Sequence, residues 1–229
     1  VLATTPQNSI AHNNLGVIAE RRGKLEQAMK HYRQSLQIRS DNEEAHFNLG
    51  VILAGRGKLD EAMEHYRKAL QIRPDNADAH FNLGNALYMS GQPKEAMEEY
   101  RQTLRSQPDH ATAHYNLGNG LYMDGQLEEA MAHYQAVLRI HPRSAEAHNN
   151  LGAILAERGQ LADAMIHYRQ ALGINPRNAE AHNNLGNALF ESGRLEEAIQ
   201  QYRQALEIDR NFSEARQALT RALKQQGKH

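Results

Sequence analysis

Asparagine and histidine recur at fixed intervals along this sequence, and both side chains form directional hydrogen bonds. Near-copies of the hexapeptide Ala-His-Asn-Asn-Leu-Gly begin every 34 residues. Their first residues are Ala11, Ala45, Ala79, Ala113, Ala147 and Ala181. The fourth residue is always Asn, whose carboxamide offers both a donor and an acceptor, the two groups that a peptide unit also presents. The spacing therefore suggests a row of amides able to hold a polypeptide main chain.

The histidines could instead be metal ligands, since imidazole is a common ligand. Ten of the 13 histidines repeat with the 34-residue period. They are His12, His46, His80, His114, His148 and His182, with His31, His65, His133 and His167 nineteen residues after four of these. A metal site needs ligands that converge on one point. We therefore expect these histidines to pack within the fold, with pH-sensitive packing as an alternative, and we expect no metal.

Composition argues against several other chemistries. The chain has no cysteine, and Lys plus Arg (26) nearly balances Asp plus Glu (27), so no bulk charge favours nucleic acid or an anionic membrane. No nucleophile elbow, phosphate-binding Gly loop or paired-His helix is present. No apolar run approaches the ~20 residues that a membrane-spanning helix needs. We expect a soluble, cytoplasmic protein that is not an enzyme and has no cofactor.

The period defines the elements that position these side chains. Self-similarity at 20 to 50 residues is the signature of a solenoid, in which each unit buries its apolar face against its neighbours. We number the positions of each unit as sites 1 to 34. The six units are 9-42, 43-76, 77-110, 111-144, 145-178 and 179-212. Residues 1-8 are expected to end a preceding repeat, and 213-229 to form a capping helix or a truncated repeat.

Each unit contains two helical patterns. Apolar or small residues at sites 3, 7, 8, 10 and 11 have helical spacing and predict a first helix, helix A. Gly at site 15 of every unit predicts its end. Carboxylates at sites 18 and 19 favour the start of a second helix, helix B, and Pro93 at site 17 suits a first turn. Helix B carries Ala, Tyr and Leu at sites 20, 24 and 28, and is expected to close near site 32, where four units have Pro.

This pattern of Leu-Gly at sites 7 and 8, Ala at 20, an aromatic at 24 and Pro at 32 resembles the tetratricopeptide repeat family. The resemblance covers residues 9-212. It implies an all-α fold, a right-handed superhelical solenoid of antiparallel helix pairs, with six repeats. His occupies site 4, where the family frequently has Trp, and Ser40 and Arg210 replace the usual Pro.

In family members with Asn at site 6, such as the repeat array of O-GlcNAc transferase, these amides run along the concave surface and hold an extended ligand. The resemblance assigns this role to Asn14, Asn48, Asn82, Asn116, Asn150 and Asn184. The alternative is that each amide bonds to the backbone of the adjacent unit. The family's carboxylate clamp, which needs Lys or Arg at sites 2, 5 and 6, is absent.

Sites 2, 5, 9, 12 and 13 share one face of helix A, which in the family lines the inside of the superhelix. The aromatic and methionine residues outside the repeated framework concentrate on this face in units 2 to 4. Together with two asparagines at site 9, the candidate side-chain pockets are Phe47, Phe81, Asn85, Tyr88, Met89, Tyr115, Asn119, Tyr122 and Met123. The alternative is that these rings pack against neighbouring helices. In units 5 and 6 the same face is polar and acidic.

The sequence therefore predicts an interaction scaffold that binds an extended peptide or protein segment. One alternative is that the chain is the substrate-recruiting array of a glycosyltransferase similar to O-GlcNAc transferase. Another is end-to-end self-association. Because Ala218 replaces the site-6 Asn after the sixth unit, we expect the binding surface to end there.

Overall fold

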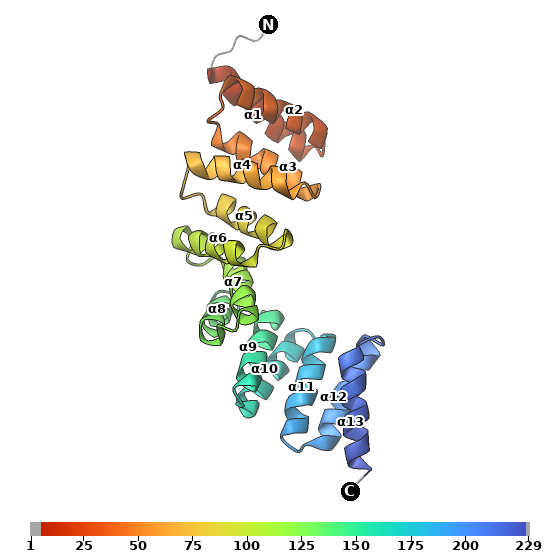
Figure 1. The fold of residues 1–229 in the computed structure, drawn as a ribbon. Coiled ribbons are helices and arrows are strands. Elements are labelled where there is room, and N and C mark those ends of the chain that lie inside the picture. The colour runs from red at the N-terminus through yellow and green to blue at the C-terminus, as the bar shows by residue number, and fades with distance from the viewer. Residues whose placement is uncertain (1–5, 228–229) are drawn as a thin grey trace. The chain divides into compact units, whose positions relative to one another are not determined.

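The computed structural model describes residues 6–227, and side chains from residue 8 onward. Within that range all regular structure is α-helical, in thirteen helices joined by short turns (Figure 1). They are α1 (Pro6–Arg21), α2 (Leu25–Ile38), α3 (Glu43–Gly55), α4 (Leu59–Ile72), α5 (Ala77–Met89), α6 (Pro93–Ser106), α7 (Ala111–Met123), α8 (Leu127–Ile140), α9 (Ala145–Glu157), α10 (Leu161–Ile174), α11 (Ala179–Glu191), α12 (Leu195–Ile208) and α13 (Ser213–Gln226). Odd-numbered helices are the predicted helices A, and α2 to α12 are the predicted helices B.

The chain divides into two compact bodies, an N-terminal body (Val1–Gly120) and a C-terminal body (Leu121–His229), with the boundary inside α7. In the N-terminal body, α1 packs on α2, α3 on α4 and α5 on α6, and α2 and α4 each contact the next helix A. The C-terminal body repeats this scheme from α8 to α13. Each helix pair therefore buries its apolar face against the next pair, as expected for repeat proteins.

In α3, α5, α7, α9 and α11, helix A begins where a side chain at site 34 caps it. The Oδ1 atoms of Asn42, Asn76 and Asn178 accept the backbone N–H of the Ala three residues on, at 3.0–3.2 Å. Ser144 Oγ and His110 Nδ1 do the same at 3.2 and 3.1 Å. A capping side chain satisfies one of the free N–H groups at a helix start. These caps were not predicted, because site 34 lies outside the periodic apolar pattern.

Glycine at site 15 ends helix A as predicted. Gly57 and Gly193, for example, have φ of +74° and +75°, a conformation that residues with a Cβ rarely adopt. Helix B then begins at site 17, with Pro93 in the first turn of α6. Helix B ends at site 30, two residues earlier than the sequence suggested. The residue that follows is extended both before Pro, as at Arg73 with φ −130° and ψ 90°, and without it, as at Arg39 with φ −144° and ψ 101°. Pro at site 32 favours this ending but is not required for it.

The site-8 glycine lets helix B approach helix A closely. A Cβ built on Gly50, Gly84, Gly152 or Gly186 would lie 2.6–2.7 Å from a ring carbon of the site-24 Tyr in the same unit. These tyrosines are almost fully buried. The Gly–Tyr contact therefore fixes the spacing inside each pair.

The first and last helices differ from those between them. On α1, Leu15 and Ile18 are exposed, although Leu49 and Ile52 at the same sites of α3 are buried. On α13, Thr220 takes the site-8 position and its hydroxyl donates to Arg216 O at 2.9 Å. Among the described residues, no helix is long and apolar enough to cross a membrane.

Candidate functional site

The side chains at sites 2, 5, 6, 9, 12 and 13 of the helices A form a surface that we call the helix-A face. In the N-terminal body, α3 and α5 are in contact, and in the C-terminal body α9 contacts α11 and α11 contacts α13. Neighbouring helices A therefore present their side chains next to one another within each body. Pockets open on this face in both bodies.

The pocket of the N-terminal body has a volume of about 280 Å³ and lies between α5 and α7, over the buried Tyr100. Five predicted site residues line it: Asn85, Tyr88, Met89, Asn116 and Asn119. Tyr88 is 48% exposed and Met89 is 69% exposed, unusually large values for apolar side chains. The pocket can accept an apolar side chain beside amides that hydrogen-bond a main chain.

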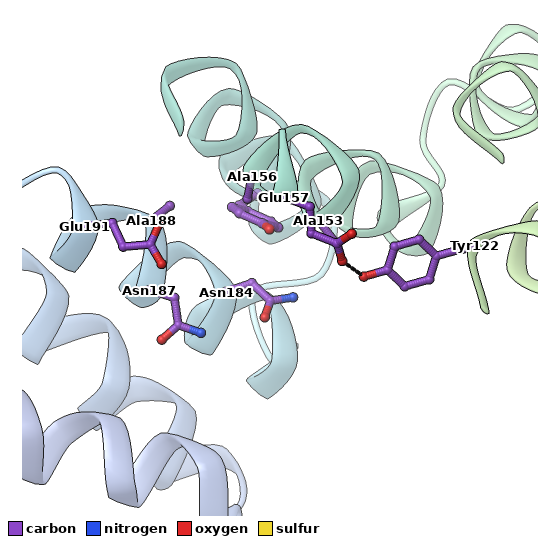
Figure 2. Close-up of a pocket in the computed structure, with 9 residues that line it drawn as sticks. Tyr122, Ala153, Ala156, Glu157, Asn184, Asn187, Ala188 and Glu191 are labelled. Atoms are coloured by element: carbon purple, nitrogen blue, oxygen red, sulfur yellow. Dashed lines mark hydrogen bonds between the residues drawn. The ribbon is translucent and has the colours of Figure 1, made fainter. Parts of the chain in front are cut away.

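A second pocket, of about 310 Å³, lies in the C-terminal body between Tyr122 and helices α9 and α11 (Figure 2). The Tyr122 hydroxyl donates to Glu157 Oε1. Burial and this carboxylate raise the pKa of Tyr122 to about 12, so the phenol stays protonated. Glu191, Asn184 and Asn187 complete the polar wall. With two carboxylates and no basic lining residue, the pocket attracts cationic groups.

The site-6 asparagines Asn82, Asn116 and Asn184 use their amide donor within the protein. Asn82 Nδ2 donates to the backbone oxygen of Asp78 in its own helix at 2.8 Å. Asn116 Nδ2 donates to Asn85 Oδ1 at 3.1 Å, and Asn184 Nδ2 to Asn149 Oδ1 at 3.2 Å, both in the preceding unit. The Oδ1 acceptor is what these three amides can offer a peptide N–H.

The remaining site-6 asparagines vary in exposure. Asn14 is exposed, and Asn48 and Asn150 are half-buried. Asn48 hydrogen-bonds the Tyr32 hydroxyl of the preceding unit. Contacts between units are therefore one role of these amides. The partners seen for Asn48, Asn116 and Asn184 are side chains, whereas the alternative interpretation of the sequence expected backbone groups.

Four of the five predicted aromatic residues, all except Tyr88, are half-buried. The Phe47 ring lies 6.1 Å from Tyr66, and the Phe81 ring lies 6.0 Å from Tyr100 and 4.6 Å from His110, measured between centroids. Both rings are half-buried and pack between helices. Tyr115 and Tyr122 are half-buried as well, whereas Met123 is 75% exposed.

The periodic histidines pair across helices A and B. Nδ1 of His46 lies 2.9 Å from Nδ1 of His65, and the pairs His12–His31 and His148–His167 have distances of 3.2 and 3.1 Å. Two further pairs are His80 with Glu99 at 2.6 Å and His182 with Gln201 at 2.7 Å. Among the described residues, no three His, Asp or Glu side chains form a group that could hold a metal.

The His46–His65 pair shows how one proton is shared. His46 Nε2 lies 3.0 Å from Ser40 O and must carry a hydrogen to bond it, which makes Nδ1 of neutral His46 the acceptor. His65 then donates from its Nδ1. With 5.1 Å between ring centroids and 2.9 Å between the nitrogens, the two nitrogens face each other directly. The pair is a hydrogen bond that packs the two helices together.

Several pocket residues were absent from the predicted set. Asn187 lies at site 9, as do Asn85 and Asn119, so the pattern already used for units 3 and 4 could have identified it. Glu157 and Glu191 occupy site 13, the site of Met89 and Met123. They were recognised as acidic positions on this face but not as parts of a pocket.

The fold and its helix-A face define a class of protein, the all-α superhelical solenoids built from two-helix repeats. Family profiles described as "TPR repeat" match residues 21–55 and 52–91, and those described as "Tetratricopeptide repeat" match 81–144, 133–165 and 155–222. The chain therefore belongs to the tetratricopeptide repeat family.

Solved structures share the fold. YrrB, described as "a TPR protein with an unusual peptide-binding site", is 23% identical over 82% of this chain and 96% of its own, with a TM-score of 0.74. PilF of Pseudomonas aeruginosa is 21% identical over 92% and 96%, with a TM-score of 0.74. MamA is 25% identical over 71% and 95%, with a TM-score of 0.67. No curated protein sequence matches the chain.

Proposed function

We propose that the chain is a protein-interaction scaffold whose helix-A face binds an extended peptide segment. The observation that carries this proposal is the pocket over Tyr100, where the exposed Tyr88 and Met89 lie next to Asn116 and Asn119. Exposed apolar side chains grouped around a cavity mark interaction sites. The amides beside them are suited to a peptide main chain. The peptide-binding site described for YrrB agrees with this use of the fold.

The pocket beside Tyr122 gives the C-terminal part of the helix-A face a different ligand preference. Glu157 and Glu191 would favour peptides with basic side chains, while Tyr88 and Met89 would favour apolar ones. A linear peptide library displayed on phage and selected on the whole chain supplies the probes. Enriched sequences should contain apolar and basic residues.

Replacing both Tyr88 and Met89 with Ala is expected to weaken the binding of the selected peptides by about tenfold or more. Tenfold corresponds to about 1.4 kcal/mol, and each truncated interface anchor costs about 1 kcal/mol or more. Both side chains are largely exposed, so the melting temperature should change little. Ile166→Ala is the matched control, because Ile166 is an apolar residue of helix B that is 51% exposed. Isothermal titration calorimetry measures the affinity. Equal affinities for the double variant and the control would refute the role of this pocket.

Asn82→Ala tests the amide row separately. The Asn82 amide donates within its own helix, so its removal leaves the contacts between units intact. We expect a twofold to tenfold weaker affinity for the selected peptides, the loss of one hydrogen bond of about 0.5–1.5 kcal/mol, at an unchanged melting temperature. Asn116→Ala, which also breaks the bond to Asn85, should lower the melting temperature as well. If Asn82→Ala lowers stability and spares affinity, the amide is structural only.

A further inference from the structure

A third pocket lies at the last junction of the C-terminal body, where α11 meets α13. Its volume is about 340 Å³. Asn183 and Asn187 of α11 form one wall, and Glu214, Gln217, Ala218 and Arg221 of α13 form the other. The sequence pattern placed the end of the binding surface at Ala218, so this pocket lies at the expected limit of the helix-A face.

The preceding junction shows how the same position is completed elsewhere. There, Asn149 at site 5 of α9 uses both ends of its amide. Its Nδ2 donates to Glu180 Oε1 at 3.1 Å, and its Oδ1 accepts from Asn184 Nδ2 at 3.2 Å. Both partners come from sites 2 and 6 of α11. The buried amide is thus paired by the next helix A at this junction, whereas at the first junction the Oδ1 of Asn13, also at site 5, has no hydrogen-bond partner among the described residues.

Asn183 occupies the same site of α11, and the next helix A is α13. Site 2 of α13 keeps a carboxylate, Glu214, but site 6 is Ala218, which has no donor to offer. Asn183 is 6% exposed, and its Oδ1 has no hydrogen-bond partner among the described residues. An unpaired buried acceptor destabilises the fold, so the position gains from any donor that reaches it.

The other groups of the pocket restrict the kind of ligand that can supply this donor. Asn187 Oδ1 accepts from the Tyr202 hydroxyl at 2.9 Å, so the Nδ2 donor is what Asn187 can offer a ligand. The Arg221 guanidinium lies 4.7 Å above the centroid of the Phe190 ring, at the edge of the pocket. The pocket thus combines one buried acceptor with an amide donor, which matches the N–H and C=O of another amide.

We propose that this pocket binds an amide group of an incoming peptide, whose N–H takes the place of the missing site-6 Asn and donates to Asn183 Oδ1. The amide's C=O accepts from Asn187 Nδ2. The inference rests on the proposed function, because an extended peptide is the carrier of the amide. It extends the helix-A face past Ala218. The amide comes either from the main chain of the peptide or from an Asn or Gln side chain.

Small amides test the pocket without the rest of the peptide. The whole ¹⁵N-labelled chain is titrated in NMR with N-methylacetamide, a main-chain mimic, with acetamide, a side-chain mimic, and with acetate. We expect one or both amides to shift the Asn183 and Asn187 side-chain signals, and the stronger of the two identifies the source. Shifts by acetate alone, centred on Arg221, or no shift by either amide, would overturn the proposal.

Ala218→Asn is the decisive variant, because it restores the side chain that closes the preceding junction. The amide probes should then no longer shift Asn183. Conversely, Asn184→Ala should open an equivalent position at Asn149, where the probes should produce new shifts. Asn183→Leu is the control. It removes the acceptor and should abolish the probe-induced shift of Asn187, and it tests the proposal even where Ala218→Asn does not fold. Probe shifts in this pocket that persist in both variants would contradict the assignment.

Thermal unfolding gives a second readout. In a double-mutant cycle, Ala218→Asn should raise the melting temperature by about 2–4 °C more in the wild-type chain than in the Asn183→Leu chain, as one added hydrogen bond implies. The cycle cancels the lower helix propensity of Asn. No difference between the backgrounds would refute the pairing. These variants leave Tyr88 and Met89 unchanged. If the selected peptides still bind while the amide probes do not shift the Asn183 and Asn187 signals, this inference is wrong and the proposed function is not affected.

Discussion

Replacing Gly186 with Val is expected to lower the free energy of unfolding by roughly 1–3 kcal/mol, the usual cost of overpacking a core, or more if Tyr202 cannot move. A Cβ at residue 186 would lie 2.6 Å from Tyr202 Cε1, much closer than van der Waals contact allows. Tyr202 is fully buried, and its hydroxyl is held by Asn187. Urea unfolding followed by circular dichroism measures the change.

Gly173→Ala is the matched control for this result. Gly173 lies in α10, and a Cβ there would meet no atom within 4 Å. Alanine is the better helix former, so this variant should gain up to about 1 kcal/mol. Opposite signs for the two substitutions would show that the tyrosine contact, and not the backbone, requires glycine at site 8. Equal stabilities would mean that the helix pair can separate at no cost.

Acidification is expected to destabilise the fold through the histidine pairs. Burial and the facing His46 lower the pKa of His65 to about 4, and burial lowers the pKa of His46, His148 and His167. A group whose folded pKa is depressed below 6.5 stabilises the fold above that pH. This stability is lost as the pH falls from 6.5 through the folded pKa. For His65 the effect is at most on the order of 3 kcal/mol, and solvent screening of this partly buried pair lowers it. Melting temperatures between pH 7 and 4 measure it.

Two pairs of the same chain provide the controls. His65→Gln would give unit 2 the arrangement already present at His182–Gln201, and should reduce the acid destabilisation. His80 is the opposite case. Burial lowers its pKa, but the hydrogen bonds to Glu99 and Pro74 O and the Glu99 charge outweigh this and raise it overall. Its contribution is therefore present below pH 6.5 and is lost as the pH rises through the folded pKa. An identical pH dependence in wild type and His65→Gln would contradict the pairing.

The helices could be predicted from the sequence because packing in a repeat protein depends on periodic residues. Ala, Leu, Gly and Tyr at fixed sites face the same neighbours in every unit, so one pattern repeated six times is unambiguous. The capping residues, such as Asn42 and His110, escaped prediction because a cap depends on the local geometry of a single residue outside the period.

The sequence predicted the helix face that carries the candidate site, but not the pockets on that face. Sequence spacing put Tyr88 and Met89 on that face, the family resemblance put Asn116 there, and the structure brings the three together around one pocket. Spacing could not tell that Phe81 packs on Tyr100 and His110, because a side chain at the edge of a face can turn toward solvent or toward a neighbouring helix. Nor could it give the direction of the Asn amides, which depends on the partners that surround each one.

The threonine at site 8 of α13 makes the two ends of the array chemically different. A further helix B with a site-24 tyrosine could not dock on α13 as in the other units, because the Thr220 side chain stands where glycine accommodates the ring. At α1, by contrast, Leu15 and Ile18 still offer the surface on which such a helix packs elsewhere. Additional 34-residue modules grafted by gene fusion should extend the array when placed before α1 or inserted before α13, and not when appended after it.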